Sequence, residues 1–132
     1  MRATLSEYRQ APRKVRLVAD SIRGKGVKDA LAALSHLDKR AAAPLRRLLE
    51  SAVANAKQTG IAADGLMIRE IHVNGGTVLK RSRPRARGRA FPIKKRTSNV
   101  TLVLAQGFSP KVKKAARKAK KTETVASAGS GK

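Results

Sequence analysis

The sequence has no cysteine and no tryptophan, and its only aromatic residues are Tyr8, Phe91 and Phe108. The absence of cysteine excludes disulfide bonds, thiolate zinc sites and cysteine nucleophiles. No apolar run reaches the roughly 18 residues that a membrane-spanning helix needs, and no signal-peptide pattern opens the chain. These features are compatible with a reducing, cytosolic setting.

Acidic residues are also scarce: 8 Asp and Glu residues stand against 31 Lys and Arg residues, for a net charge of +23. Residues 1–70 carry a net +7 and residues 71–132 a net +16, and no acidic residue lies between Glu70 and Glu123. A cationic stretch of this length contains nothing that neutralises its field. A phosphate backbone is the obvious partner, because each phosphate that the protein neutralises releases a counterion.

Hydrophobic residues make up 41% of the chain, which is enough for one small core. This fraction rules out a wholly disordered basic tail protein, which would be far poorer in leucine, isoleucine and valine. We therefore expect one globular domain over residues 1–107. Residues 108–132 are small, polar and basic, and we expect them to form a disordered tail with a transient helix.

Helical periodicity predicts three helices in the first half of the chain. The first begins near Pro12 and ends at the glycines around residue 24; the second covers residues 27–37. The third is capped by Asp38 and closed by Gly60, with Pro44 in its first turns or at a kink. The residues expected to face the core are Val15, Val18, Ala19, Ile22, Val27, Ala30, Leu31, Leu34, Leu37, Leu45, Leu48, Leu49, Ala52, Val53 and Ala56.

Alternating patterns predict strands elsewhere. Residues 2–10 are typical of an edge strand. In residues 67–73 we expect Met67, Ile71 and Val73 to share one face of a strand. In residues 99–105 we expect Val100, Leu102 and Leu104 to share one face of another. These two strands should pair, because strands that follow each other in the sequence usually do.

The roughly 25 residues between these two strands lack a core pattern, and we interpret residues 74–98 as a long hairpin arm with its tip near Pro84–Gly88. A two-stranded ribbon is marginally stable in water, so we expect this arm to become ordered in anionic surroundings. Its nine cations are Lys80, Arg81, Arg83, Arg85, Arg87, Arg89, Lys94, Lys95 and Arg96.

Several classes of function are disfavoured. Glu70 and His72 share a strand face, but nothing beside them resembles a nucleophile or substrate pocket, so we interpret them as a surface salt link. We predict no catalytic site, no metal site, no cofactor and no small-molecule substrate. A membrane-surface role would need bulky apolar anchors on a basic helix, and the most basic stretch contains proline and glycine instead.

The kind of nucleic acid follows from the same residues. Three aromatic residues are too few for a stacking platform on a sheet. A helix-turn-helix is conceivable over residues 12–37, but its second helix has only Lys28 and Asp29 near its start, which is poor for reading a groove. An arginine-rich ribbon fits a folded RNA better, because arginine makes bidentate contacts with phosphates.

Three segments resemble the bacterial large-subunit ribosomal protein twenty-two family. They are GTVLKRSRPRARGRA at 76–90 followed by IKKRTS at 93–98, APRKVRLVADSIRGK at 11–25 and, more weakly, SAVANA at 51–56. The resemblance covers about residues 2–106. It implies an α+β fold in which a three-stranded antiparallel sheet packs on three helices, with an extended β-hairpin and a basic C-terminal tail.

The resemblance also implies a function: binding to large-subunit ribosomal RNA beside neighbouring ribosomal proteins in the cytoplasmic ribosome, support of subunit assembly, and a hairpin that lines the nascent-peptide exit tunnel. Two departures from the family pattern are Asn99, in place of a usual histidine, and residues 74–77, in place of a more acidic turn. The RNA-binding residues that it implies are Arg13, Lys14, Arg16 and Arg23 at the globular end, Lys80, Arg81, Arg83, Arg85, Arg87 and Arg89 at the tip, and Lys94, Lys95 and Arg96 on the returning limb.

Two other interpretations remain open on the sequence alone. A nucleoid or DNA-coating protein would explain the charge and the lysine-rich tail, but not the strand–arm–strand layout of residues 67–105. A basic enzyme acting on nucleic acid lacks the carboxylate cluster that would hold its metal ions.

Overall fold

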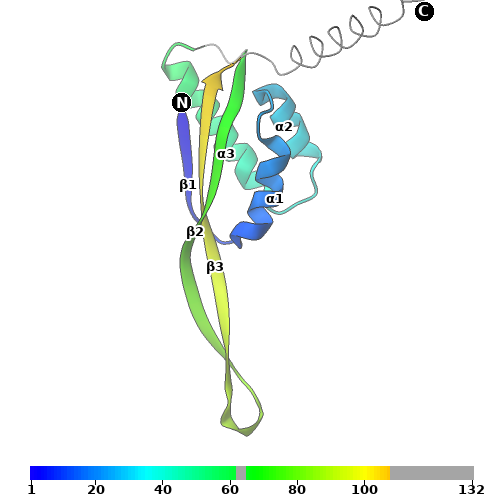
Figure 1. Cartoon of the computed structure of the whole chain (residues 1–132), viewed down its shortest axis with the longest axis vertical. Coiled ribbons are helices and arrows are strands. Elements are labelled where there is room, and N and C mark those ends of the chain that lie inside the picture. The colour runs from blue at the N-terminus through cyan, green and yellow to red at the C-terminus, as the bar shows by residue number, and fades with distance from the viewer. Residues whose placement is uncertain (62–64, 108–132) are drawn as a thin grey trace, which may run out of the picture.

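The structure of the protein is a computed structural model that describes residues 1–61 and 65–107 (Figure 1). Within these residues it has three helices and a three-stranded antiparallel sheet, which confirms the α+β class. The predicted tail, 108–132, lies outside the described residues. In chain order the elements are β1 (Arg2–Tyr8), α1 (Pro12–Ile22), α2 (Val27–His36), α3 (Ala42–Gln58), β2 (Leu66–Pro84), a short 3-10 turn (Ala86–Gly88) and β3 (Ala90–Gln106).

The sheet has the order β1-β3-β2, so β3 is central and β1 lies at an edge, as predicted. The first part of β2 and the last part of β3 pair beside β1, and the helices pack against this region on one face (Figure 1). The predicted inward residues Val100, Leu102 and Leu104 of β3 are all buried there.

The two first helices follow the sequence patterns closely. Pro12 opens α1, where its missing N–H would have had no helical partner, and Gly24 follows the helix with φ +71°. The four residues expected to face the core from α1 are buried. In α2, Leu31 is only partly buried, as is Leu37 just beyond the helix, although both pack against the core.

The prediction that Asp38 caps the third helix is wrong. The helix begins at Ala42, its N-cap residue is Ala41, and no side chain caps it. Both alanines are buried, so packing rather than a capping side chain holds the first turn. Pro44 is the third residue of α3, where its missing N–H leaves no helical hydrogen bond broken. Gly60, with φ +76°, follows the helix as expected.

The prediction for the face of β2 is also wrong in part. Leu66 and Ile68 are buried, whereas Met67 is only half-buried and points the other way from Ile71. The register between β2 and β3 shifts between Ile68 and Glu70, where a β-bulge leaves Arg69 unpaired. One extra residue reverses the alternation, so apolar residues before and after the bulge both reach the core.

Beyond the body, β2 and β3 continue as a twisted two-stranded ribbon (Figure 1). Their pairing extends to Pro84 opposite Ala90, next to the 3-10 turn. Residues 80–96, which we call the distal hairpin, are all exposed. The turn is closed by a hydrogen bond from the Arg85 N–H to the Arg89 carbonyl oxygen at 2.8 Å, and Arg87 and Gly88 both adopt positive φ.

Candidate nucleic-acid interface

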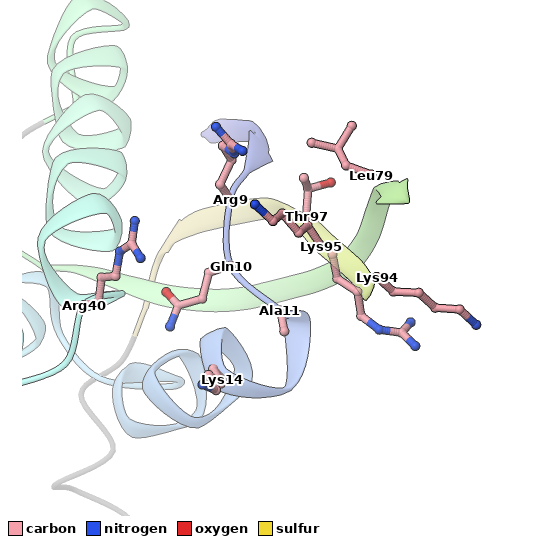
Figure 2. Close-up of a pocket in the computed structure, with 10 residues that line it drawn as sticks. Arg9, Gln10, Ala11, Lys14, Arg40, Leu79, Lys94, Lys95 and Thr97 are labelled. Carbon is pink, nitrogen blue, oxygen red and sulfur yellow. The ribbon is translucent and has the colours of Figure 1, made fainter. Parts of the chain in front are cut away.

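A basic hollow of about 740 Å³ lies where the distal hairpin joins the body (Figure 2). We call it the root hollow. Figure 2 shows its side chains arriving from separate segments: Arg9 from the loop after β1, Lys14 from α1, Arg40 from the turn before α3, and Lys94 from β3. The lining residues are Arg9, Gln10, Ala11, Lys14, Arg40, Leu79, Lys94, Lys95, Arg96 and Thr97.

Six of these ten residues are cationic and none is acidic. Within the part of the chain that the structure describes, none of the six cations forms an ion pair or a side-chain hydrogen bond. Six unpaired cations around one hollow repel one another, and an anion placed among them removes that repulsion. The hollow is therefore suited to hold phosphate groups.

Tyr8 brings two of the six cations together. Its hydroxyl lies 2.8 Å from Oε1 of Gln10 and 3.2 Å from the backbone carbonyl oxygen of Arg40. The contact with Arg40 joins the end of β1 to the turn before α3, two segments about 30 residues apart in the chain. The result is that Arg9 and Arg40 line the same hollow.

The distal hairpin continues the cationic surface away from the body. The root hollow already includes Lys94, Lys95 and Arg96, and the tip carries the other predicted cations. Lys80 lies directly opposite Lys94 in the register. Like charges at opposite positions of an antiparallel pair are destabilising unless something neutralises them. This pair is a further position where a phosphate would stabilise the protein.

The base of the hairpin is held by contacts around Glu7. The Thr97 hydroxyl lies 3.0 Å from the Glu7 carboxylate and 2.8 Å from the Thr77 carbonyl oxygen. The Thr77 hydroxyl is 3.4 Å from the other carboxylate oxygen. The amide oxygen of Asn99 accepts a hydrogen bond from the Glu7 backbone N–H at 2.7 Å. Asn99, one of the departures noted in the sequence, therefore joins β1 to β3 at the hairpin base.

Two of the four cations expected at the globular end make contacts inside the protein. Arg16 donates two hydrogen bonds to the carbonyl oxygen of Val73, and Arg23 donates one to that of Ile71. Arg23 also pairs with Asp20 at 3.0 Å. These guanidinium groups cover the edge of β2 that does not pair with β3. RNA binding by Arg16 and Arg23 remains a prediction.

The remaining globular-end cations are placed differently. Arg13 and Lys14 are exposed on the first turn of α1, and only Lys14 lines the root hollow. The sequence argument missed Arg9 and Arg40, because both lie outside the resembling motifs and outside the acid-free stretch. Their contribution depends on tertiary placement, for which the sequence carries no signal.

The structure adds no sign of a catalytic or metal centre within the described residues. Glu70 and His72 form an exposed pair with 3.3 Å between Oε2 and Nε2, as expected of a surface link. No group of three or more potential ligands among the residues described could hold a metal ion. Across the same ranges, no helix is both long and apolar enough to cross a membrane.

Comparison with known proteins gives a consistent result. The model of the family described as Ribosomal protein L22p/L17e matches residues 3–105. Among curated relatives, a large ribosomal subunit protein uL22 from Mesoplasma florum is 54% identical over 105 residues, which cover 79% of this chain and 94% of the relative. Proteins of the same name from Geotalea uraniireducens and Caldicellulosiruptor saccharolyticus are 52% and 51% identical over 79% of this chain, and the matches cover 95% and 86% of those relatives.

Proposed function

The chain belongs to the ribosomal protein L22p/L17e family, and from that premise we propose that it binds large-subunit ribosomal RNA through the root hollow and the distal hairpin, used as one surface. Family membership makes the chain a structural, non-enzymatic constituent of the large ribosomal subunit, located with ribosomal RNA and neighbouring ribosomal proteins in the cytoplasm. The alternative of a nucleoid or DNA-coating protein is not favoured.

The observation that carries the proposal is the convergence of unpaired cations from distant segments. Arg9, Lys14 and Arg40 come from the body, and the distal hairpin supplies the others without an acidic residue among them. The packing of the hydrophobic core does not require any of these side chains to be cationic. Their mutual repulsion destabilises the free protein. An RNA backbone supplies phosphates at several points of this surface at once and releases counterions as it binds.

The distal hairpin suggests the finer part of the proposal. Residues 80–96 are exposed over their whole length, so nothing in the body explains why β2 and β3 continue past it. A long narrow ribbon can enter between RNA helices where a globular surface cannot. We propose that the ribbon supports subunit assembly in this way, and that its tip reaches the wall of the peptide exit tunnel and meets the nascent chain there.

The test compares two double variants of the full-length chain. Arg40→Gln with Lys95→Gln removes two cations of the root hollow, and Arg47→Gln with Lys57→Gln removes two exposed cations of α3 outside it. Binding to purified large-subunit ribosomal RNA is measured over a range of salt concentrations. We expect the hollow variant to bind more weakly, with a salt slope reduced by about 0.7–0.9 for each lost phosphate contact.

The control variant should keep the affinity and salt slope of the unmodified chain. Equal losses in the two variants would mean that only net charge matters and would overturn the proposed surface. A duplex DNA competitor at equal phosphate concentration tests the alternative of a DNA-coating protein. Displacement of the RNA by this competitor would contradict the proposal.

A further inference from the structure

The two faces of the distal hairpin differ in chemistry. In the register of β2 and β3, Arg83 lies opposite Phe91 and Arg81 lies opposite Ile93, and residues opposite each other in a sheet project to the same face. Ser82 lies opposite Pro92 on the other face. Toward the tip, one face therefore carries an apolar strip on β3 beside guanidinium groups on β2, and the other face carries Ser82, Pro92 and the opposed lysines.

Phe91 is the exposed member of this strip. Its side chain is 60% exposed and that of Ile93 is 37% exposed, which makes them two of the three large exposed apolar residues in the described part of the chain. The third, Leu17, is isolated on α1. An exposed aromatic ring on a ribbon that is otherwise cationic has no packing role in the free protein.

The charge around the ring indicates what covers it. Arg83 has no hydrogen-bond or ion-pair partner among the described residues, and no acidic residue lies anywhere on the hairpin. A partner that presents a flat apolar surface together with negative charge satisfies both the ring and the guanidinium groups. Unpaired RNA bases have this combination, since a base offers a π-face and its backbone offers phosphates.

We propose that Phe91 and Arg83 form a stacking site for one unpaired base of the RNA. The base lies on the Phe91 ring beside Ile93, and the Arg83 guanidinium stacks on it or binds the adjoining phosphate. This inference rests on the proposed function, and it adds a contact with a base to the contacts with phosphates. The site is limited to one base, because the hairpin has one aromatic ring.

The first experiment uses the absence of tryptophan from the chain. Phe91→Trp places a single fluorophore at the site, and Pro92→Trp places one on the opposite face as a matched control. Each full-length variant is titrated with large-subunit ribosomal RNA and, separately, with inorganic polyphosphate, which has the charge without bases. We expect RNA to quench Trp at position 91 by about half or more, as stacking on a base does, and polyphosphate to leave it nearly unchanged.

Other outcomes of these titrations overturn the inference. RNA that binds without quenching at position 91 would show that no base stacks on the ring. Equal quenching at positions 91 and 92 would show proximity to RNA without a specific stacking face. Binding is followed in the same samples by filter retention, so a failure to bind RNA at all would count against the proposed function itself.

A second experiment separates stacking from charge. Phe91→Ala should weaken RNA binding about 10-fold while leaving the salt slope unchanged, because no phosphate contact is lost. Phe91→Tyr, which keeps the ring, should bind within about twofold of the unmodified chain. Arg83→Gln is the comparison variant, and the salt slope of its RNA binding should fall. An unchanged affinity in Phe91→Ala would contradict the stacking site.

Discussion

The guanidinium group of Arg16 donates two hydrogen bonds to the backbone carbonyl oxygen of Val73, at 3.2 Å from Nε and 3.0 Å from Nη2. Arg23, the residue just after α1, donates one hydrogen bond to the carbonyl oxygen of Ile71. Within the body, β2 would otherwise present unpaired carbonyl groups along its outer edge, where another strand can add. The two arginines close this part of the edge and fasten α1 to the sheet.

Both Arg13 and Arg16 are exposed, but Arg16 contacts Val73 and Arg13 makes no such contact, so Arg16 should matter more for stability. We expect Arg16→Gln to lower the free energy of unfolding by about 1 kcal/mol, the usual net value of a hydrogen bond in a folded protein. Arg13→Gln should change it by less than about 0.5 kcal/mol. Urea denaturation of the full-length variants measures both, and equal effects would show that the contact with Val73 does not stabilise the fold.

Gly76 should be intolerant of a side chain, whereas the adjacent Gly75 should accept one. A Cβ atom at position 76 would lie 2.5 Å from the Thr97 hydroxyl and 3.1 Å from the Glu7 carboxylate, while one at position 75 meets nothing within 4 Å. Thr97 is buried and short, so it cannot move aside easily. We expect Gly76→Ala to lower the free energy of unfolding by about 1–3 kcal/mol and Gly75→Ala to lower it little or not at all.

The readout for the glycine pair is thermal unfolding, supported by amide exchange at Thr77 and Thr97. Faster exchange at both threonines in Gly76→Ala alone would locate the damage at the hairpin base. If the two alanine variants unfolded at the same temperature, the close packing around Glu7 would not exist in solution.

Leu49 and Leu17 offer a matched test of the core. Leu49 of α3 is fully buried, whereas Leu17 of α1 is 73% exposed. Truncation of Leu49 to alanine should lower the free energy of unfolding by about 2–5 kcal/mol, because it leaves a cavity. At Leu17 the cost should stay below about 0.5 kcal/mol. Chemical denaturation of Leu49→Ala and Leu17→Ala provides the comparison, and a cost below about 0.5 kcal/mol at Leu49 would refute its place in the core.

Sequence periodicity predicted the elements best where the pattern runs without interruption. The stripe of α3 and the alternation of Val100, Leu102 and Leu104 both face the core as expected, although Val53 of the stripe is only partly buried. The face of β2 could not be predicted in full, because Arg69 carries no sign that it forms a bulge. The start of α3 was missed for a related reason: Asp38 is a good capping residue, but buried Ala41 and Ala42 decide where the helix begins.

The candidate site was predictable in its charge and not in its shape. The acid-free stretch and the motifs pointed to the hairpin cations, and Lys14 with Lys94, Lys95 and Arg96 indeed meet around one hollow. Arg9 and Arg40 were missed, since their segments come together only in the folded chain, where the Tyr8 hydroxyl contacts the Arg40 carbonyl oxygen. A count of charges also cannot separate Arg13 from Arg16, although only the Arg16 guanidinium donates hydrogen bonds to the Val73 carbonyl oxygen.

Amide hydrogen exchange along the distal hairpin tests most directly the claim that RNA completes this structure. In the full-length chain alone, we expect amides of residues 80–94 to be protected less than about 10-fold, because an exposed two-stranded ribbon opens readily. Those of residues 100–104, in the centre of the sheet, should be protected far more. Addition of large-subunit ribosomal RNA should slow exchange in the hairpin by about 100-fold or more, because the ribbon becomes ordered and its amides are shielded from water. Protection of the hairpin equal to that of the sheet before RNA is added, or no change after it binds, would contradict the claim.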